Sequence, residues 1–269
     1  MTAASGRDPS SRPIPFRGAG FAPRGRGSIA WAFFGLVLIG WQFGSHYGWI
    51  DGLILPSPVA ILGALWSLTE SGDLWRHLSA SVFRLVTGWL LGTLAALVFG
   101  FAIGLFALWR SVGIPMVAAL FPIPKIALLP LFIIWFGIDE PSKIATILFG
   151  VFFPTVIATY SGVDGVPRSL IRMAQSFGVP TYRILWTIVL PGALPSILAG
   201  FRISIAIGIV LLVAAEMIGA QWGVGALVLA AGSLMQTDVL LAGVVMLSLL
   251  GLAISIILGR AERYLLRWR

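Results

Sequence analysis

The chain of 269 residues has no cysteine and only two histidines, His46 and His77, which stand apart in the sequence. The first absence excludes disulfides and thiolate metal sites, and the second excludes a His-Glu-x-x-His metal centre. Neither Gly-x-x-x-x-Gly-Lys-Ser/Thr nor Gly-x-Ser-x-Gly occurs, so the chain has no P-loop for ATP and no nucleophile elbow. We therefore expect a non-catalytic chain without cofactor-binding or metal-binding residues.

Charged residues are also scarce, at 10% of the chain against 58% hydrophobic residues and a mean hydropathy of +0.99. Soluble domains carry about 25% charged residues. A soluble core of this size cannot hide so much apolar surface, so the solvent around the chain must be lipid. The net charge of +8 does not indicate nucleic acid, because the arginines follow the termini and loops and do not gather on one folded face.

The first 28 residues are rich in Pro, Gly, Ser and Arg, which predicts a disordered tail. A cleaved signal peptide is the alternative, but no short apolar run followed by a small-residue cleavage site is present. Residues 29–269 are then expected to form one transmembrane domain.

Six stretches are apolar enough to span a bilayer, which takes about 20 residues. They are 29–49, 85–109, 111–138, 144–163, 193–218 and 239–259. Proline and glycine inside them are tolerated because neighbouring helices satisfy the freed backbone groups. Small residues such as Gly88, Gly92 and Ala96 allow close helix packing. The sequence therefore predicts an all-α membrane protein with six transmembrane helices.

The loop charges predict the orientation of these spans. With six spans, both termini lie on one side together with Arg110 and the loop 164–191, and this side holds most of the 18 lysines and arginines. The positive-inside rule therefore makes both termini and this loop cytoplasmic. On the other side, residues 55–81 carry apolar residues at helical spacing, which predicts one helix lying at the outer membrane interface. The apolar residues are Val59, Leu62, Leu65 and Trp66.

The loop 164–191 has the pattern of two short amphipathic helices. Asp164 is placed to cap the first helix, Pro167 suits its first turn, and Gly178 is placed to end it with a positive φ. In the second, apolar residues recur at i, i+3, i+4 and i+7, before the Leu190-Pro191 step redirects the chain into the fifth span. Such a hairpin in the cytoplasm is expected to dock a partner. A linker resting on the bilayer surface is the alternative.

At this loop the chain resembles the inner-membrane permease subunits of ATP-binding-cassette importers. That family carries Glu-Ala-Ala, three residues, Gly, nine residues, Ile, one residue and Leu-Pro. The same spacing here joins Arg172, Met173, Ala174, Gly178, Ile188, Leu190 and Pro191. Arg172 and Met173 replace the Glu and the first Ala, so a contact made by an acidic side chain is lost at this point. The resemblance implies that these residues form the coupling loop that fits a groove on an ATPase subunit.

Other stretches resemble the nitrate, sulfonate, taurine and bicarbonate branch of that family, and most of all its aliphatic-sulfonate and taurine permeases. They are 55–58, 72–88, 128–144, 189–203 and 236–239, and the resemblance runs from about residue 29 to the C-terminus. It implies a type I permease fold in the bacterial inner membrane and a homodimer. It also implies two ATPase subunits below, which hydrolyse the ATP, and a periplasmic solute-binding protein above.

Three charges inside the spans are candidates for the solute pathway, because a charge in lipid is costly. Lys125 and Arg202 could attract an anion, and Glu216 is the one carboxylate within a span. Snorkelling or structural pairing is the alternative for each of them. The expected solute is a small anion such as an aliphatic sulfonate or taurine, with nitrate or another small solute of the branch as the alternative.

Two functions of other classes compete with an importer. An ion-gradient-driven transporter would show symmetry between its halves and carboxylates at mid-membrane, and the sequence shows neither. A membrane scaffold would leave the loop 164–191 without an ATPase partner.

Overall fold

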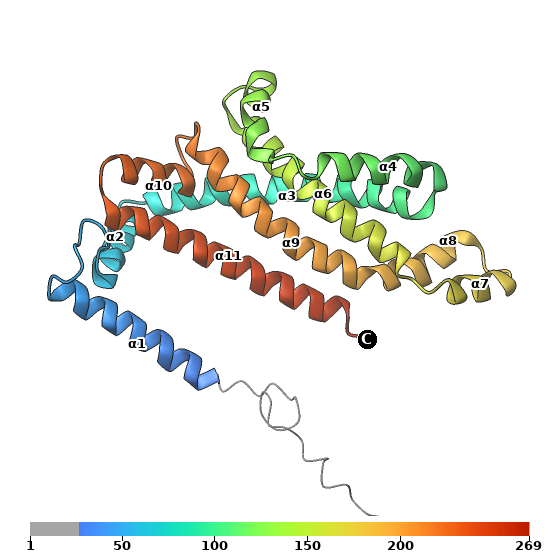
Figure 1. Ribbon diagram of the computed structural model, residues 1–269, viewed down its shortest axis with the longest axis horizontal. Helices are drawn as coiled ribbons and strands as arrows, with labels where there is room; N and C mark the ends of the chain where they lie inside the picture. The colour runs from blue at the N-terminus through green and yellow to red at the C-terminus, as the bar shows by residue number, and fades with distance from the viewer. Residues whose placement is uncertain (1–26, 269) are drawn as a thin grey trace, which may run out of the picture.

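The computed structural model describes residues 27–268, which form helices joined by short loops, with no strand among them (Figure 1). In chain order they are α1 (Gly27–His46), α2 (Pro58–Glu70), α3 (Asp73–Leu105), α4 (Ala107–Leu120), η3 (Lys125–Leu128), α5 (Leu129–Phe136), α6 (Glu140–Asp164), α7 (Arg168–Ser176), α8 (Thr181–Ile184), η4 (Leu185–Val189), α9 (Leu190–Met217), α10 (Val224–Ser233) and α11 (Thr237–Leu265). The all-α prediction is confirmed. Gly27 and Ser28 already belong to α1, and the rest of the predicted disordered tail lies outside the described residues.

Four of the described helices are long and apolar enough to cross a membrane. They are α3, α6, the helix 181–217 that runs from α8 through α9, and α11. The bent pair formed by α4 and η3–α5 would make a fifth span. In addition, α1 has 20 residues, a length of about 30 Å, and covers residues 29–46 of the first predicted span, 29–49.

The centre of the bundle is α6, which packs against α3 on one side and α9 on the other. Its contact with α3 follows small residues spaced four apart, Gly88, Gly92, Ala96, Gly100 and Gly104. A Cβ added to Gly92 would lie 2.4 Å from the Val151 side chain. Only glycine permits so close an approach there, and the predicted packing at Gly88, Gly92 and Ala96 is confirmed.

The prediction of one interfacial helix over 55–81 is wrong, because the chain breaks at Gly72. This glycine has φ 80°, which ends α2 and lets α3 start at Asp73. The predicted second span therefore begins 12 residues earlier than expected. On α2, Ile61 and Ala64 are buried against α11, while Val59 is exposed together with most of the apolar face that the sequence indicated.

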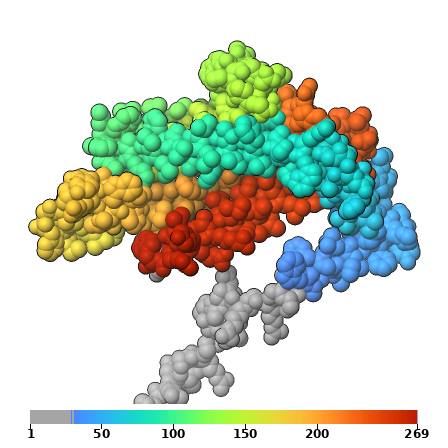
Figure 2. Space-filling view, turned by 180° about the vertical axis from the view of Figure 1, so that it is seen from behind, coloured from blue at the N-terminus to red at the C-terminus, as the bar shows by residue number. Residues whose placement is uncertain are grey.

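The prediction of a continuous third span over 111–138 is also wrong. The chain leaves α4 at Leu120 and turns by 90° into η3 and α5. Pro122 and Pro124 explain the break, because each lacks the N–H that a helix requires and restricts the residue before it. Anchored on α6 by Leu129 and Phe132, α5 projects from the body in both views (Figures 1 and 2).

The helix α10 has no counterpart among the predicted elements. Its 10 residues are too few to span a bilayer, so the length criterion passed over them. It packs on α9 and α11 and lies at the end of the bundle occupied by α2 (Figure 1). We call this the α10 end. The opposite end, where α7, α8 and the C-terminal end of α11 lie, is the hairpin end.

The candidate coupling hairpin and the charged residues of the bundle

The loop 164–191 folds as the predicted hairpin and stands on an apolar base. Ala174 of α7 is 7% exposed and packs with Ile184, Val189 and Ile197, which belong to the second arm and to α9. The cluster is completed by Val163 at the end of α6, Val166 in the turn that follows it, and Ala193 of α9. Because one side of each arm is buried on the bundle, the hairpin is fixed to the transmembrane helices and is not a linker lying free.

Gly178 ends α7 as the sequence predicts. Its φ is 68°, its N–H donates to the Gln175 carbonyl at 3.0 Å, and the Val179 N–H donates to the Ala174 carbonyl at 3.1 Å. These two bonds make a Schellman motif, which satisfies carbonyls at the helix end. Nothing lies within 4 Å of a Cβ added at Gly178, so the backbone angle alone requires glycine here.

Asp164 does not cap α7. It is the last residue of α6, and its carboxylate accepts two hydrogen bonds from Arg110, at 2.6 and 2.7 Å. The residue that precedes α7 is Pro167, which makes no side-chain cap. Local sequence placed Asp164 correctly before a helix, but the arginine at the start of α4 takes it as a partner and ties the ends of α4 and α6 together.

The second arm runs into the bundle without the turn that we expected at Leu190-Pro191. Helix is continuous from Thr181 to Met217, with a π-helical turn over Leu185–Val189. Pro191 has no N–H to donate to the Thr187 carbonyl, and the Leu190 N–H instead donates to the Leu185 carbonyl. The proline therefore widens the helix without breaking it, and the hairpin and α9 form one 37-residue element.

The hairpin leaves basic and large apolar side chains exposed. Phe177 is 80% exposed and Trp186 is 70% exposed, and Met173 and Tyr182 are exposed as well. Arg172 is exposed as well, and no ion pair of the described residues includes it. Of the remaining coupling-loop candidates, Ile188, Leu190 and Pro191 are half-buried.

Lys125, the first candidate of the solute pathway, lies at the bend between α4 and α5. Its ammonium donates to the carbonyls of Leu120, at 3.2 Å, and Phe121, and it lies 4.9 Å from the centre of the Phe153 ring. These carbonyls belong to the last turn of α4. Lys125 is half-buried and stabilises the bend by neutralising the negative end of that helix.

The other two candidates sit on α9 but far apart. Arg202 is an exposed residue that pairs with Glu262 of α11. Glu216 lies 14 residues further along, about 21 Å away, and its side chain is fully buried. The structure therefore does not bring Lys125, Arg202 and Glu216 into one site.

Glu216 belongs to a buried network around Arg84, whose side chain is 3% exposed. Arg84 donates to Glu216 at 2.7 Å, to both Glu140 oxygens at 2.6 Å, and to the Trp222 carbonyl at 2.6 Å. Ser81 and the Gly225 N–H donate to Glu216, each at 2.8 Å. One arginine thus joins α3, the start of α6, the end of α9 and the loop before α10.

Gly223 lets the loop before α10 approach this network. Its φ is 146°, and an added Cβ would lie 2.4 Å from the Glu216 carboxyl carbon and 2.7 Å from Arg84. Its N–H donates to the His77 ring at 3.1 Å. Arg84 is not among the functional candidates identified from the sequence, because its partners lie 56 and 132 residues away.

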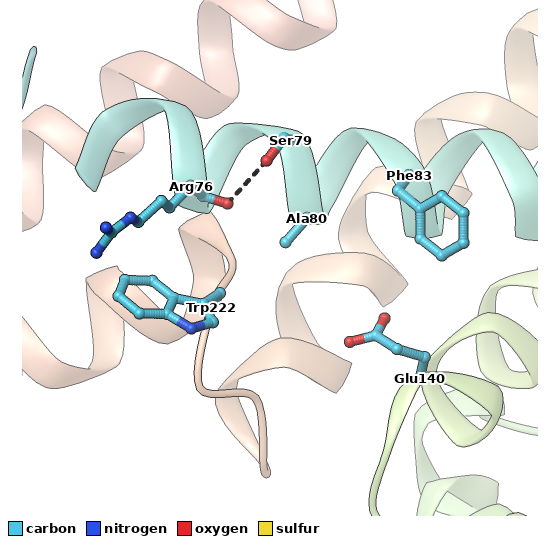
Figure 3. A pocket seen from close by; sticks show the side chains of 6 residues that line it. All are labelled: Arg76, Ser79, Ala80, Phe83, Glu140 and Trp222. Carbon is cyan, nitrogen blue, oxygen red and sulfur yellow. Dashed lines mark hydrogen bonds between the residues drawn. The ribbon is translucent and has the colours of Figure 1, made fainter. Parts of the chain in front are cut away.

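An open pocket of about 660 Å³ lies beside the network at the α10 end. Its walls come from the start of α3, the start of α6 and the loop before α10 (Figure 3). They are lined by Arg76, Ser79, Ala80, Phe83, Glu140 and Trp222. Arg76 lies over the Trp222 ring, 5.3 Å from its centre, and none of the pocket residues was singled out from the sequence as a functional candidate.

Residues 88–268 match the family described as "Binding-protein-dependent transport system inner membrane component". The chain belongs to this family. Members of the family are non-catalytic membrane subunits of ATP-binding-cassette importers, so the chain is a multi-pass permease subunit of the inner membrane, as the resemblance implied.

Curated relatives cover most of this permease. It is 37% identical to the putative aliphatic sulfonates transport permease protein SsuC of Escherichia coli K12, over 87% of this chain and 89% of that protein. It is 38% identical to the taurine transport system permease protein TauC of the same strain, over 81% of this chain and 82% of that protein. SsuC of Bacillus subtilis 168 is 35% identical, over 87% and 85% of the two chains.

A solved structure shares the fold of the permease. A chain of the MetNI methionine transporter in an inward-facing conformation matches with a TM-score of 0.61 and 22% sequence identity. The match covers 71% of this permease and 95% of that chain. It supports the ATP-binding-cassette permease fold.

Proposed function

We propose that this permease forms the transmembrane core of an ATP-driven importer that carries a small organic sulfonate, an aliphatic sulfonate or taurine, into the cell. The family membership and the names of the sulfonate and taurine relatives support this function. The mechanism rests on one observation: the second arm of the hairpin and α9 form a single continuous helix.

The exposed face of the hairpin docks an ATPase subunit. Phe177 and Trp186 supply large apolar contacts, and aromatic residues of this kind dominate the energy of protein interfaces. Arg172 and Met173 lie beside them, at the positions where the family signature has Glu and Ala. The groove of the partner must therefore accept a basic side chain and not an acidic one.

Closure of two ATPase subunits would push the hairpin along the membrane normal. Because the second arm and α9 are one helix, the displacement reaches the α10 end, where Glu216 connects α9 to α3 and α6 through Arg84. Alternating access is then a rocking of packed helices, as the close small-residue contacts between α3 and α6 allow.

The complete pathway requires a second copy of the chain and a solute-binding protein. We place six spans, with α1 and the bent pair included, both termini in the cytoplasm, and the α10 end facing the periplasm. The arginines of the hairpin and of the last ten residues support this orientation. Exposed Arg202 and half-buried Lys125 remain pathway candidates, whereas the enclosure of Glu216 favours a supporting role beside the pathway.

The test is uptake by vesicles that contain the permease, its partner ATPase and its binding protein. We expect ATP-dependent uptake of taurine or an alkanesulfonate, and no ATP hydrolysis by the permease alone. Uptake of a neutral or cationic solute, with no sulfonate or nitrate transport, would overturn the assignment. Uptake that follows an ion gradient without ATP would support the secondary transporter instead.

A further inference from the structure

Two arginines lie at the α10 end, Arg84 in the buried network and Arg76 in the wall of the pocket, and only Arg84 has most of its hydrogen-bond donors in use. Arg84 uses its guanidinium in four hydrogen bonds, three of them to carboxylates. Arg76 makes no side-chain hydrogen bond within the described residues, and its only ion pair there is to Asp73, at 3.7 Å. Since that pair is exposed, it contributes little and leaves the donors of Arg76 available.

Four of the charged groups behind the pocket balance one another, and the exposed carboxylate of Asp139, at the N-cap of α6, stands beside them. Glu140 and Glu216 share Arg84, and Lys143 lies nearby with its ammonium bonded to the carbonyls of Ile138 and Asp139. Glu140 faces the pocket, but both of its oxygens already accept hydrogen bonds from Arg84. The pocket wall therefore offers no free carboxylate to a cation, and Arg76 is the group that gives the pocket its charge.

The wall opposite Arg76 is held in place. The Trp222 carbonyl accepts a hydrogen bond from buried Arg84, and the next residue, Gly223, donates its N–H to His77. These bonds hold the backbone at Trp222, whose ring lies beneath the Arg76 guanidinium. Ala80 and Phe83 add apolar surface from α3, the helix that also carries Arg76 (Figure 3). An arginine beside an aromatic ring suits an organic anion, because the oxyanion accepts hydrogen bonds from the guanidinium and the carbon chain packs on the ring.

We propose that this pocket binds the transported solute through its sulfonate group, with Arg76 as the anion-binding residue and Trp222 as the wall for the aliphatic chain. This site rests on the proposed function, since it assumes a sulfonate solute. It would receive the solute at the outer mouth of the pathway, and it gives the membrane subunit a selectivity of its own for organic anions.

The direct test is equilibrium binding of labelled taurine and hexanesulfonate to the purified permease–ATPase complex without binding protein. We expect at least one sulfonate to bind, and Arg76→Gln to weaken that binding about tenfold, the value of one charge-assisted hydrogen bond. Arg76→Lys should keep most of the affinity. Trp222→Leu should weaken hexanesulfonate more than taurine, because the longer chain covers more of the ring.

Matched controls separate the pocket from its alternatives. Arg263→Gln removes another arginine, in the last turn of α11 at the hairpin end, and should leave binding unchanged. Equal binding of sulfonate by wild type and Arg76→Gln would overturn the site. Two other results would also overturn it. In the first, the Arg76→Gln complex binds sulfonate normally but no longer binds its solute-binding protein. In the second, it binds sulfonate normally but no longer retains phosphatidylglycerol.

The failure of the site differs from the failure of the proposed function. If vesicles with the wild-type complex and binding protein take up no sulfonate, the proposed function fails. If they take up sulfonate and Arg76→Gln changes neither uptake nor binding, only the pocket assignment fails. Folding of each variant is followed by the size-exclusion profile of the complex, which a change at the exposed Arg76 should not alter.

Discussion

The two ends of the bundle are stabilised in different ways. At the hairpin end, apolar packing around Ala174 and Ile184 and the backbone geometry of Gly178 fix the hairpin, and large side chains stay exposed. At the α10 end, Arg84 joins two carboxylates from two helices, and it is buried with Glu216 while Glu140 stays partly exposed. The comparison indicates that the first end is shaped for a partner and the second is shaped to keep the helix ends together.

The largest effect should come from Arg84. Replacing it with Leu leaves Glu216 buried without a countercharge, which costs about 3–5 kcal/mol. We expect Arg84→Leu to lower the thermal unfolding temperature of the purified complex sharply or to prevent its accumulation. Combining Arg84→Leu with Glu216→Leu should recover part of the loss, because no unpaired charge then lies in the core. An Arg84→Leu chain as stable as wild type would contradict the role of the network.

Replacing two glycines distinguishes the cost of a steric clash from the cost of backbone strain. Gly223→Ala places a Cβ 2.4 Å from the Glu216 carboxyl in a backbone region that only glycine favours, and should destabilise by about 3 kcal/mol. Gly178→Ala meets only its φ of 68°, with nothing near its Cβ, and should cost about 1 kcal/mol. The two unfolding temperatures, measured side by side, check this order, and an equal loss at both positions would refute it.

Replacing Arg202 of α9 should cost less stability than replacing Arg84 of α3, because Arg202 is exposed and Arg84 is buried. Arg202 and Glu262 are paired but partly exposed, so Arg202→Gln should change stability by no more than about 1 kcal/mol. If Arg202 faces the pathway, Arg202→Gln should instead slow sulfonate uptake in vesicles. Unchanged uptake with an intact complex would remove Arg202 from the pathway.

The smallest effect on stability, and a specific effect on assembly, should come from the exposed hairpin face. Phe177 is 80% exposed, so Phe177→Ser should change the free energy of unfolding of the isolated permease by no more than about 0.5 kcal/mol. The same change should lower the amount of ATPase that copurifies. Phe34 of α1, 62% exposed, offers a control, since Phe34→Ser should not alter ATPase recovery.

Features that depend on neighbours in the sequence were predictable, and those that depend on distant partners were not. Gly178 was identified from its local pattern, because a helix end needs a positive φ wherever the helix lies. Gly88 and Gly92 were likewise visible as a small-residue stripe. The role of Arg84 could not be predicted, since the carboxylates that pair with it come from two other helices.

Two of the errors have local causes, prolines whose effect was misjudged, and a third has a distant partner as its cause. Pro122 and Pro124 marked the break after α4, but hydropathy joined the two halves because both are apolar. Pro191 was taken as a redirection, whereas a π-helical turn absorbs it. Asp164 had the residue type and position of a cap, and Arg110, 54 residues away, took it as a partner.

The central claim is that the hairpin transmits ATPase closure to the bundle, and Gly178→Val tests it most directly. A β-branched residue cannot hold the left-handed backbone at this position without strain, so α7 would end in another direction. We predict that vesicles containing Gly178→Val, with partner ATPase and binding protein, lose ATP-driven sulfonate uptake although the chain is inserted in the membrane. Normal uptake together with normal ATPase binding in that variant would show that the hairpin is not the coupling element.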